Sequence, residues 1–99
     1  MNAMKLLVII CSGGRIDEVR KIIDEHEVHT FTELDGLRGS GATGRRLGTR
    51  AYPGAVSMLF TAVSKDKAVE LVAALSKFSD ECAEGEGLRV FEMDVTAAI

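Results

Sequence analysis

The stretch that decides the fold is V-S-M-L-F-T-A-V (56–63), followed by Ser64 and then by K-D-K-A-V-E-L-V-A-A-L-S-K-F (65–78). The first part is a β-prone apolar run, which predicts a strand over 56–63. Ser64 is a good helix N-cap residue, so a helix is expected to begin at Lys65 and to run to Phe78. The expected buried side of this helix consists of Val69, Leu71, Val72, Leu75 and Phe78.

The rest of the chain, on both sides of this unit, is predicted to form three more strands and one more helix. An apolar run predicts a strand over 5–10, and apolar residues at spacings of three and four predict a helix over 15–26. Alternation predicts strands over 28–34 and 88–95, with a turn at 84–87. The order β-α-β-β-α-β predicts an α+β, ferredoxin-like fold, in which a four-stranded antiparallel sheet carries two helices on one face.

Composition limits the class of protein. The 99 residues suffice for a single domain, 1–99, and the net charge of −3 argues against nucleic-acid binding. No apolar run approaches the roughly 20 residues that span a bilayer, and the run at 5–10 is too short for a signal peptide. Two cysteines make no disulfide framework, which favours a reducing cytoplasm. The second sheet face also carries apolar residues, so self-association is expected.

The segment 35–55 differs from the rest of the chain. It contains six of the ten glycines and four arginines (Arg38, Arg45, Arg46 and Arg50) against one acid, Asp35. A loop of this length between two strands is usually functional or disordered. We expect a flexible recognition arm that meets phosphate, carboxylate or an acidic partner; a solvated hairpin tip is the alternative. Gly39, Gly41 and Gly44 spell G-x-G-x-x-G, but no helix follows, so this is not a dinucleotide fingerprint.

The sequence gives less support for a metal site, a catalytic site or an RNA-binding surface. His26, His29, Cys11 and Cys82 lack supported metal-ligand spacing, so no metal site is expected. No catalytic residue and no pairing of a nucleophile with a base is identified, which indicates a non-enzyme. An RNA-binding domain of the same fold would need exposed aromatics on its central strands, and it does not suit an acidic body.

Several pieces of the chain together resemble the PII signalling family, and they cover nearly all of it. They are Val8–Ile10 leading to Arg15–Val19, Thr30–Gly36, Val56–Val63 leading to Asp66–Glu70, and Gly85–Gly87 leading to Val90–Val95. The resemblance implies a homotrimer with a long T-loop between strands two and three, here within 35–55. It also implies adenine-nucleotide binding between adjacent subunits.

Carried over residue by residue, the resemblance implies a nucleotide site. Its residues are Thr30, Gly36 and Arg38 on the T-loop side, and Gly85, Glu86, Gly87 and Arg89 at the turn. The family lysine is replaced by Leu88, which favours ADP or AMP over ATP. The loop residues Arg45, Arg46, Arg50 and Tyr52 are expected to contact a partner, a transporter or an enzyme.

The expected function is therefore that of a cytoplasmic regulator, of the kind found in nitrogen regulation. It would sense a small anionic ligand and signal through its arginine- and glycine-rich loop. The alternative is an adaptor or structural trimer of the same fold without a small-molecule ligand. No cofactor is expected, and neither nucleic acid nor membrane insertion is part of either hypothesis.

Overall fold

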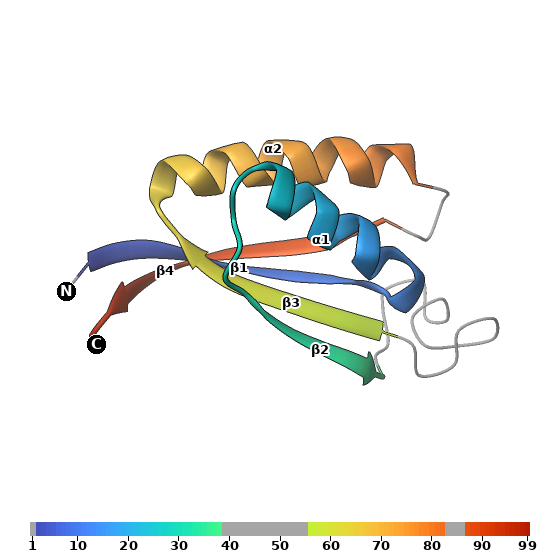
Figure 1. The fold of residues 1–99 in the computed structure, drawn as a ribbon, viewed down its shortest axis with the longest axis horizontal. Coiled ribbons are helices and arrows are strands. Elements are labelled where there is room, and N and C mark those ends of the chain that lie inside the picture. The colour runs from blue at the N-terminus through green and yellow to red at the C-terminus, as the bar shows by residue number, and fades with distance from the viewer. Residues whose placement is uncertain (1, 39–55, 83–86) are drawn as a thin grey trace.

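The fold is a four-stranded sheet covered on one face by two helices (Figure 1). The computed structural model describes residues 2–38, 56–82 and 87–99. The elements are β1 (Asn2–Ser12), η1 (Gly13–Arg15), α1 (Ile16–Glu25), β2 (Thr32–Leu37), β3 (Val56–Val63), α2 (Lys65–Glu81) and β4 (Arg89–Ala97). The strands lie in the order β2-β3-β1-β4, and all neighbours are antiparallel. The predicted ferredoxin-like fold is confirmed.

The register of β1 sorts its side chains between the two faces of the sheet. Leu7, Ile9 and Cys11 face the helices and are at most 1% exposed. They stand opposite Thr61, Leu59 and Ser57 of β3. The core above them is completed from the helices by Ile16, Val19, Ile23, Ala68, Leu71 and Leu75.

Within the described residues, both helices lie on one face of the sheet and none covers the other face. The alternate residues of β1, Leu6, Val8 and Ile10, are only partly buried there. On the outer strands the exposed fraction rises to 53% for Phe91 and 42% for Leu34. The second sheet face is therefore apolar and open, as the sequence predicts.

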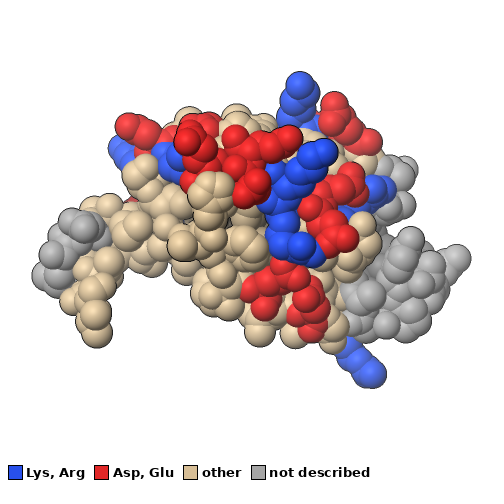
Figure 2. Space-filling view, in the orientation of Figure 1, with Lys and Arg blue, Asp and Glu red and all other residues tan. Residues whose placement is uncertain are grey.

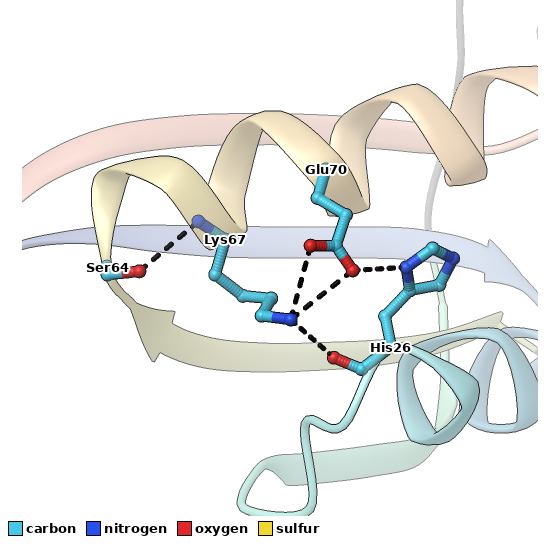
Figure 3. A network of polar contacts seen from close by, with 4 residues as sticks. All are labelled: His26, Ser64, Lys67 and Glu70. Carbon is cyan, nitrogen blue, oxygen red and sulfur yellow. Dashed lines mark hydrogen bonds and ion pairs between the residues drawn. The ribbon is translucent and has the colours of Figure 1, made fainter.

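A polar network ties the end of α1 to the start of α2 (Figure 3). The Ser64 hydroxyl accepts a hydrogen bond from the Lys67 backbone N–H at 3.2 Å, which confirms the predicted N-cap. Lys67 Nζ donates to the His26 carbonyl at 2.8 Å and to the Glu70 carboxylate at 3.2 Å. His26 Nδ1 contacts the same carboxylate. These hydrogen bonds, first that of His26 and then that of Lys67, lower the pKa of Glu70.

The second strand was predicted to begin at Val28, and this is wrong. The strand begins at Thr32, because the backbone N–H of Val28 donates to the Ile23 carbonyl at 2.9 Å and closes the end of α1. The same strand extends to Leu37, so the first residues of the segment 35–55 belong to the sheet. The remaining residues, 39–55, lie outside the described part of the chain.

The buried side of α2 also differs from the prediction at one position. Val69 is 66% exposed, and Ala68 is buried in its place. The apolar pattern at 68–72 contains more candidates than one helix face can bury, and only the packing against β1 and α1 selects among them. The helix also continues past Phe78 to Glu81.

The end of α1 places Glu27 at φ +66°, a left-handed conformation that favours glycine. We expect Glu27→Gly to raise the free energy of unfolding by about 0.5–1 kcal/mol, because it removes this strain. The measurement is urea denaturation. Glu25→Gly, inside the last turn of α1, is the matched control and should lower the same quantity by a similar amount. Equal effects of the two substitutions would refute the strained cap.

Candidate ligand-binding site at one end of the sheet

Four of the predicted site residues come to the same end of the sheet. The strand registers pair Leu37 with Val56, Val56 with Ser12, and Ile10 with Arg89. The end of β2 and the beginning of β4 therefore share one end of the molecule (Figure 1). Gly36 and Arg38 lie on the β2 side of this end, and Gly87 and Arg89 lie on the β4 side. Both arginines are exposed.

Within one chain these two pairs are far apart. β2 and β4 are the two outer strands, and β3 and β1 lie between them. Three interstrand spacings of roughly 4.8 Å give a separation of about 14 Å. The two pairs therefore lie at opposite edges of the sheet, and we refer to them as the β2 half-site (Gly36 and Arg38) and the β4 half-site (Gly87 and Arg89) of the candidate site.

Thr30 is not brought to this end. It precedes β2, six residues before Gly36, which is up to about 20 Å along an extended chain. Its carbonyl accepts a hydrogen bond from the buried Thr61 hydroxyl at 2.6 Å, so it fixes the entry to β2. The other predicted residues, Gly85, Glu86, Arg45, Arg46, Arg50 and Tyr52, lie outside the described residues.

The β2 half-site is built on an irregularity of the strand. The register of β2 against β3 shifts between Leu34 and Leu37, and Gly36 has φ +69° inside this shift. A residue with a Cβ rarely adopts that conformation, so glycine is required there. The Ser57 hydroxyl donates to Asp35 Oδ1 at 2.7 Å and fixes the residue that precedes Gly36.

Two carboxylates on the helix side of β2, those of Glu33 and Asp35, lie close to the β2 half-site. Glu33 stands opposite the buried Leu59, and its Oε1 lies 2.8 Å from Arg20 Nε of α1. Arg20 Nε makes no directed hydrogen bond, so this contact is an ion pair. Another guanidinium nitrogen of Arg20 contacts Asp17. Figure 2 shows the acidic and basic side chains intermixed over the helix side of the molecule.

The environment moves the pKa values of the two carboxyl groups in opposite directions. Burial raises the pKa of Glu33, and a hydrogen bond with Asp35 adds to this effect, while Arg20 opposes it. The hydrogen bond from Ser57 lowers the pKa of Asp35, and the bond with Glu33 lowers it further. The two groups therefore titrate as a pair.

Cys11 lies beneath this pair, inside β1, and is 1% exposed. The sequence placed it after the strand, which is wrong because β1 continues to Ser12. Burial raises the pKa of the Cys11 thiol to about 12, and Glu33 and Asp35 contribute to this rise. The thiol is therefore protonated at neutral pH, which does not suit a nucleophile.

The β4 half-site depends on the last turn of α2. The Ser79 hydroxyl accepts a hydrogen bond from the Leu88 backbone N–H at 2.9 Å. A Cβ added at Gly87 would lie 2.7 Å from the same Ser79 oxygen. Ser79 therefore holds the chain so close to the helix that glycine is needed at position 87.

The side chain of each histidine contacts a carboxylate. His26 contacts Glu70, and His29 Nδ1 lies 2.8 Å from Asp24 Oδ1. Within residues 2–38, 56–82 and 87–99, no group of three or more His, Cys, Asp or Glu side chains is placed to hold a metal ion. Over the same residues, no helix is long and apolar enough to cross a membrane.

Sequence reasoning missed Glu33, Ser57 and Ser79. Glu33 and Asp35 are two residues apart in a strand, so alternation could have placed both carboxylates on one face. The partners Ser57 and Arg20 come from other elements. They become neighbours only through the pairing of β2 with β3 and the packing of α1.

The close contact at Gly87 gives a test of the β4 half-site. We expect Gly87→Ala to lower the free energy of unfolding by about 1–3 kcal/mol, because the new methyl group overlaps the Ser79 hydroxyl. Ser79→Ala removes that oxygen. In the Ser79→Ala background, the added cost of Gly87→Ala should therefore fall below about 1 kcal/mol, a coupling that a double-mutant cycle by urea denaturation measures. Additive costs would show that the hydroxyl does not impose glycine at this position.

Comparison with known proteins shows which family this arrangement belongs to. The family model for nitrogen regulatory protein P-II matches residues 4–99. No curated protein sequence matches the chain. Among solved structures, CPII of Thiomonas intermedia K12 bound to ADP and bicarbonate superposes with a TM-score of 0.77 at 23% identity. That match covers 95% of this chain and 87% of the other.

Two further structures give the same fold. CPII of Thiomonas intermedia K12 bound to ADP, AMP and acetate matches with a TM-score of 0.76 at 21% identity, over 98% of this chain and 90% of the other. A PII-like signalling protein of Thermus thermophilus matches with a TM-score of 0.69 at 18% identity, over 94% and 87%. With its ferredoxin-like fold and a family match over residues 4–99, this chain belongs to the nitrogen regulatory protein P-II family.

Proposed function

We propose that this protein is a non-enzymatic, cytoplasmic PII-like regulator that binds an adenine nucleotide between adjacent copies of the chain. The observation that carries the proposal is the position of the two half-sites. Gly36 and Arg38 lie at one edge of the sheet, Gly87 and Arg89 lie at the other edge, and all four are at the same end. A neighbouring copy that places its β4 edge beside the β2 edge of this one unites them.

The open sheet face gives a reason for the copies to associate. Proteins of the P-II family form trimers and bind small ligands. In this chain the open face carries Leu34, Phe91 and Met93 with exposed fractions of 42% or more. Burying such side chains is favourable by roughly 25 cal/mol per Å² of apolar surface. A homotrimer in which three open faces pack together accounts for this apolar surface.

The nature of the ligand follows from the charges and from the relatives. Exposed arginines on both half-sites, Arg38 and Arg89, suit the phosphates of a nucleotide. The CPII structures contain ADP, in one case with bicarbonate and in another with AMP and acetate. For this chain we propose ADP or AMP in preference to ATP, because Leu88 stands where the family has a lysine. The turn residues Gly85 and Glu86 complete the proposed contact.

The signal is proposed to leave through the segment 39–55. It contains Arg45, Arg46, Arg50 and Tyr52, and it begins directly after the β2 half-site. A ligand held at Gly36 and Arg38 therefore touches the root of the segment that would meet a transporter or an enzyme. The family is that of nitrogen regulatory protein P-II, and on that basis we propose a role in nitrogen regulation for this chain.

The trimer has a direct test in solution. We expect multi-angle light scattering of the wild type to give three times the mass of one chain. Phe91→Asp should reduce it to one, because it places a charge in the apolar interface. Val69→Asp is the matched control: Val69 is also apolar and 66% exposed, but lies on α2, so the trimer should persist. A wild-type mass of one chain at micromolar concentration would rule out the assembly.

The nucleotide site is tested by calorimetry with ADP. We expect Arg89→Ala to weaken ADP binding by about ten- to a hundredfold, since a charge-assisted hydrogen bond contributes roughly 1.5–3 kcal/mol. Arg46→Ala, in the middle of the segment 39–55, should weaken it less. Equal losses would place the pocket elsewhere. If ADP, AMP and ATP all fail to bind at millimolar concentration, with or without bicarbonate, the adaptor without a small ligand is the better function.

A further inference from the structure

We propose that Ser79, in the last turn of α2, is a positioning residue of the β4 half-site. Its hydroxyl holds the backbone at Leu88, and through that backbone it orients the side chain of Arg89, which is proposed to meet the phosphates of the nucleotide. This role rests on the proposed function and deepens it, because it adds to the same site a residue that acts through Arg89 and is not itself a ligand contact.

The end of α2 is a firm support for the Ser79 side chain. One side of the helix is anchored in the core, where Leu71 and Leu75 are fully buried. Phe78, directly before Ser79, packs against the same core. The backbone N–H of Cys82 donates to the Ser79 carbonyl at 3.1 Å and closes the last turn. The Ser79 hydroxyl oxygen therefore has a fixed place relative to the sheet.

Two consecutive residues before β4 lie against this oxygen. The backbone N–H of Leu88 donates to Ser79 Oγ at 2.9 Å. A Cβ added at Gly87 would lie 2.7 Å from the same atom. The register of β4 with β1 ends at the pair of Arg89 and Ile10, so Leu88 lies just beyond the ladder. Ser79 thus gives the Leu88 N–H the acceptor that a strand neighbour would otherwise supply.

This contact matters for Arg89 because Arg89 is the first residue of an outer strand. In the sheet that the structure describes, β4 has β1 on one side and no strand on the other. Arg89 stands at the end of that single ladder, opposite Ile10. The ends of such a ladder open more readily than its middle. The hydrogen bond between Leu88 and Ser79 adds a second anchor one residue away.

Leu88 and Arg89 point to opposite faces of the sheet. Leu88 packs against the core on the helix side. Alternation along β4 places the exposed Arg89 on the open face, together with Phe91. A backbone that is held from the helix side therefore fixes the direction in which the guanidinium leaves the sheet on the other side. A charge-assisted hydrogen bond to a phosphate depends on that direction.

Removing the hydroxyl should loosen Arg89 without removing it. Alanine suits a helix at least as well as serine, so Ser79→Ala is expected to fold. Calorimetry with the intact protein should give an ADP dissociation constant about three- to tenfold above that of the wild type, which is the effect of one neutral hydrogen bond. Ser76→Ala, at an exposed serine one turn earlier on α2, is the matched control and should bind ADP as the wild type does.

A double-mutant cycle separates positioning from a general loss of stability. Because Ser79 acts through Arg89, Ser79→Ala should weaken ADP binding by less than about twofold in the Arg89→Ala background. In the Arg38→Ala background it should keep its full effect, since Arg38 lies at the other edge of the sheet. Additive losses with Arg89→Ala would overturn the role of Ser79. So would equal ADP affinities of Ser79→Ala and the wild type, and in either case the proposed function would stand.

A second readout does not depend on the ligand. Hydrogen exchange followed by NMR on the free protein should show a protected Leu88 amide, and Ser79→Ala should speed its exchange by about three- to tenfold, because one hydrogen bond is lost. Ser76→Ala should leave this exchange unchanged. An unchanged rate in Ser79→Ala would also overturn the proposal. If the rate rises as expected but the wild type binds no ADP at millimolar concentration, the proposed function is wrong and the role of Ser79 in binding falls with it.

Discussion

Strand β1 is the constraint on which the rest of the structure depends. It pairs antiparallel with β3 on one side and with β4 on the other, from Lys5 to Ile10 on both. Its alternate residues are apolar on both faces, so each face needs a cover. The two helices cover the face of Leu7 and Ile9 completely. The part of the chain that the structure describes offers no further element for the other face, which the proposed assembly would bury.

The same sheet explains why assembly and binding are linked in the proposed function. Antiparallel pairing brings the end of β2 and the beginning of β4 to one end of the sheet, but the strand order places them at opposite edges. A contact between the edges of two copies would bury apolar surface and complete a ligand site at once. Ligand binding would then stabilise the assembly by mass action.

The polar contacts on the helix side differ in what they do. The network of Ser64, Lys67, Glu70 and His26 is exposed to partly exposed, and it joins two helices that the core already holds together. Such surface pairs contribute little to stability. In the cluster of Glu33, Asp35, Ser57 and Arg20, which lies at the root of the β2 half-site, Ser57 and most of the Glu33 side chain are buried, while Asp35 is exposed. Burial raises the pKa of Glu33 in this cluster, while the hydrogen bond from Ser57 lowers the pKa of Asp35.

The sequence alone determined the order of the elements, the bounds of β3 and the N-cap at Ser64, because periodicity and capping are local properties. It also determined that the sheet has two apolar faces. It misplaced the beginning of β2. The left-handed conformation of Glu27 and the Val28 hydrogen bond that closes α1 do not alter the alternation of apolar and polar residues from which the strand was predicted. It could not choose between Ala68 and Val69, because that choice depends on the packing of α2 against β1 and α1.

Only the tertiary structure decided which polar residues meet. Glu33, Asp35, Ser57 and Arg20 lie on three elements, and register and helix packing bring them together. The requirement for glycine at position 87 likewise comes from Ser79, eight residues away on α2. The sequence predicted Gly36, Arg38, Gly87 and Arg89 as site residues only through the resemblance to the PII family. Their division into two half-sites at opposite edges follows from the strand order, a long-range property that no local pattern encodes.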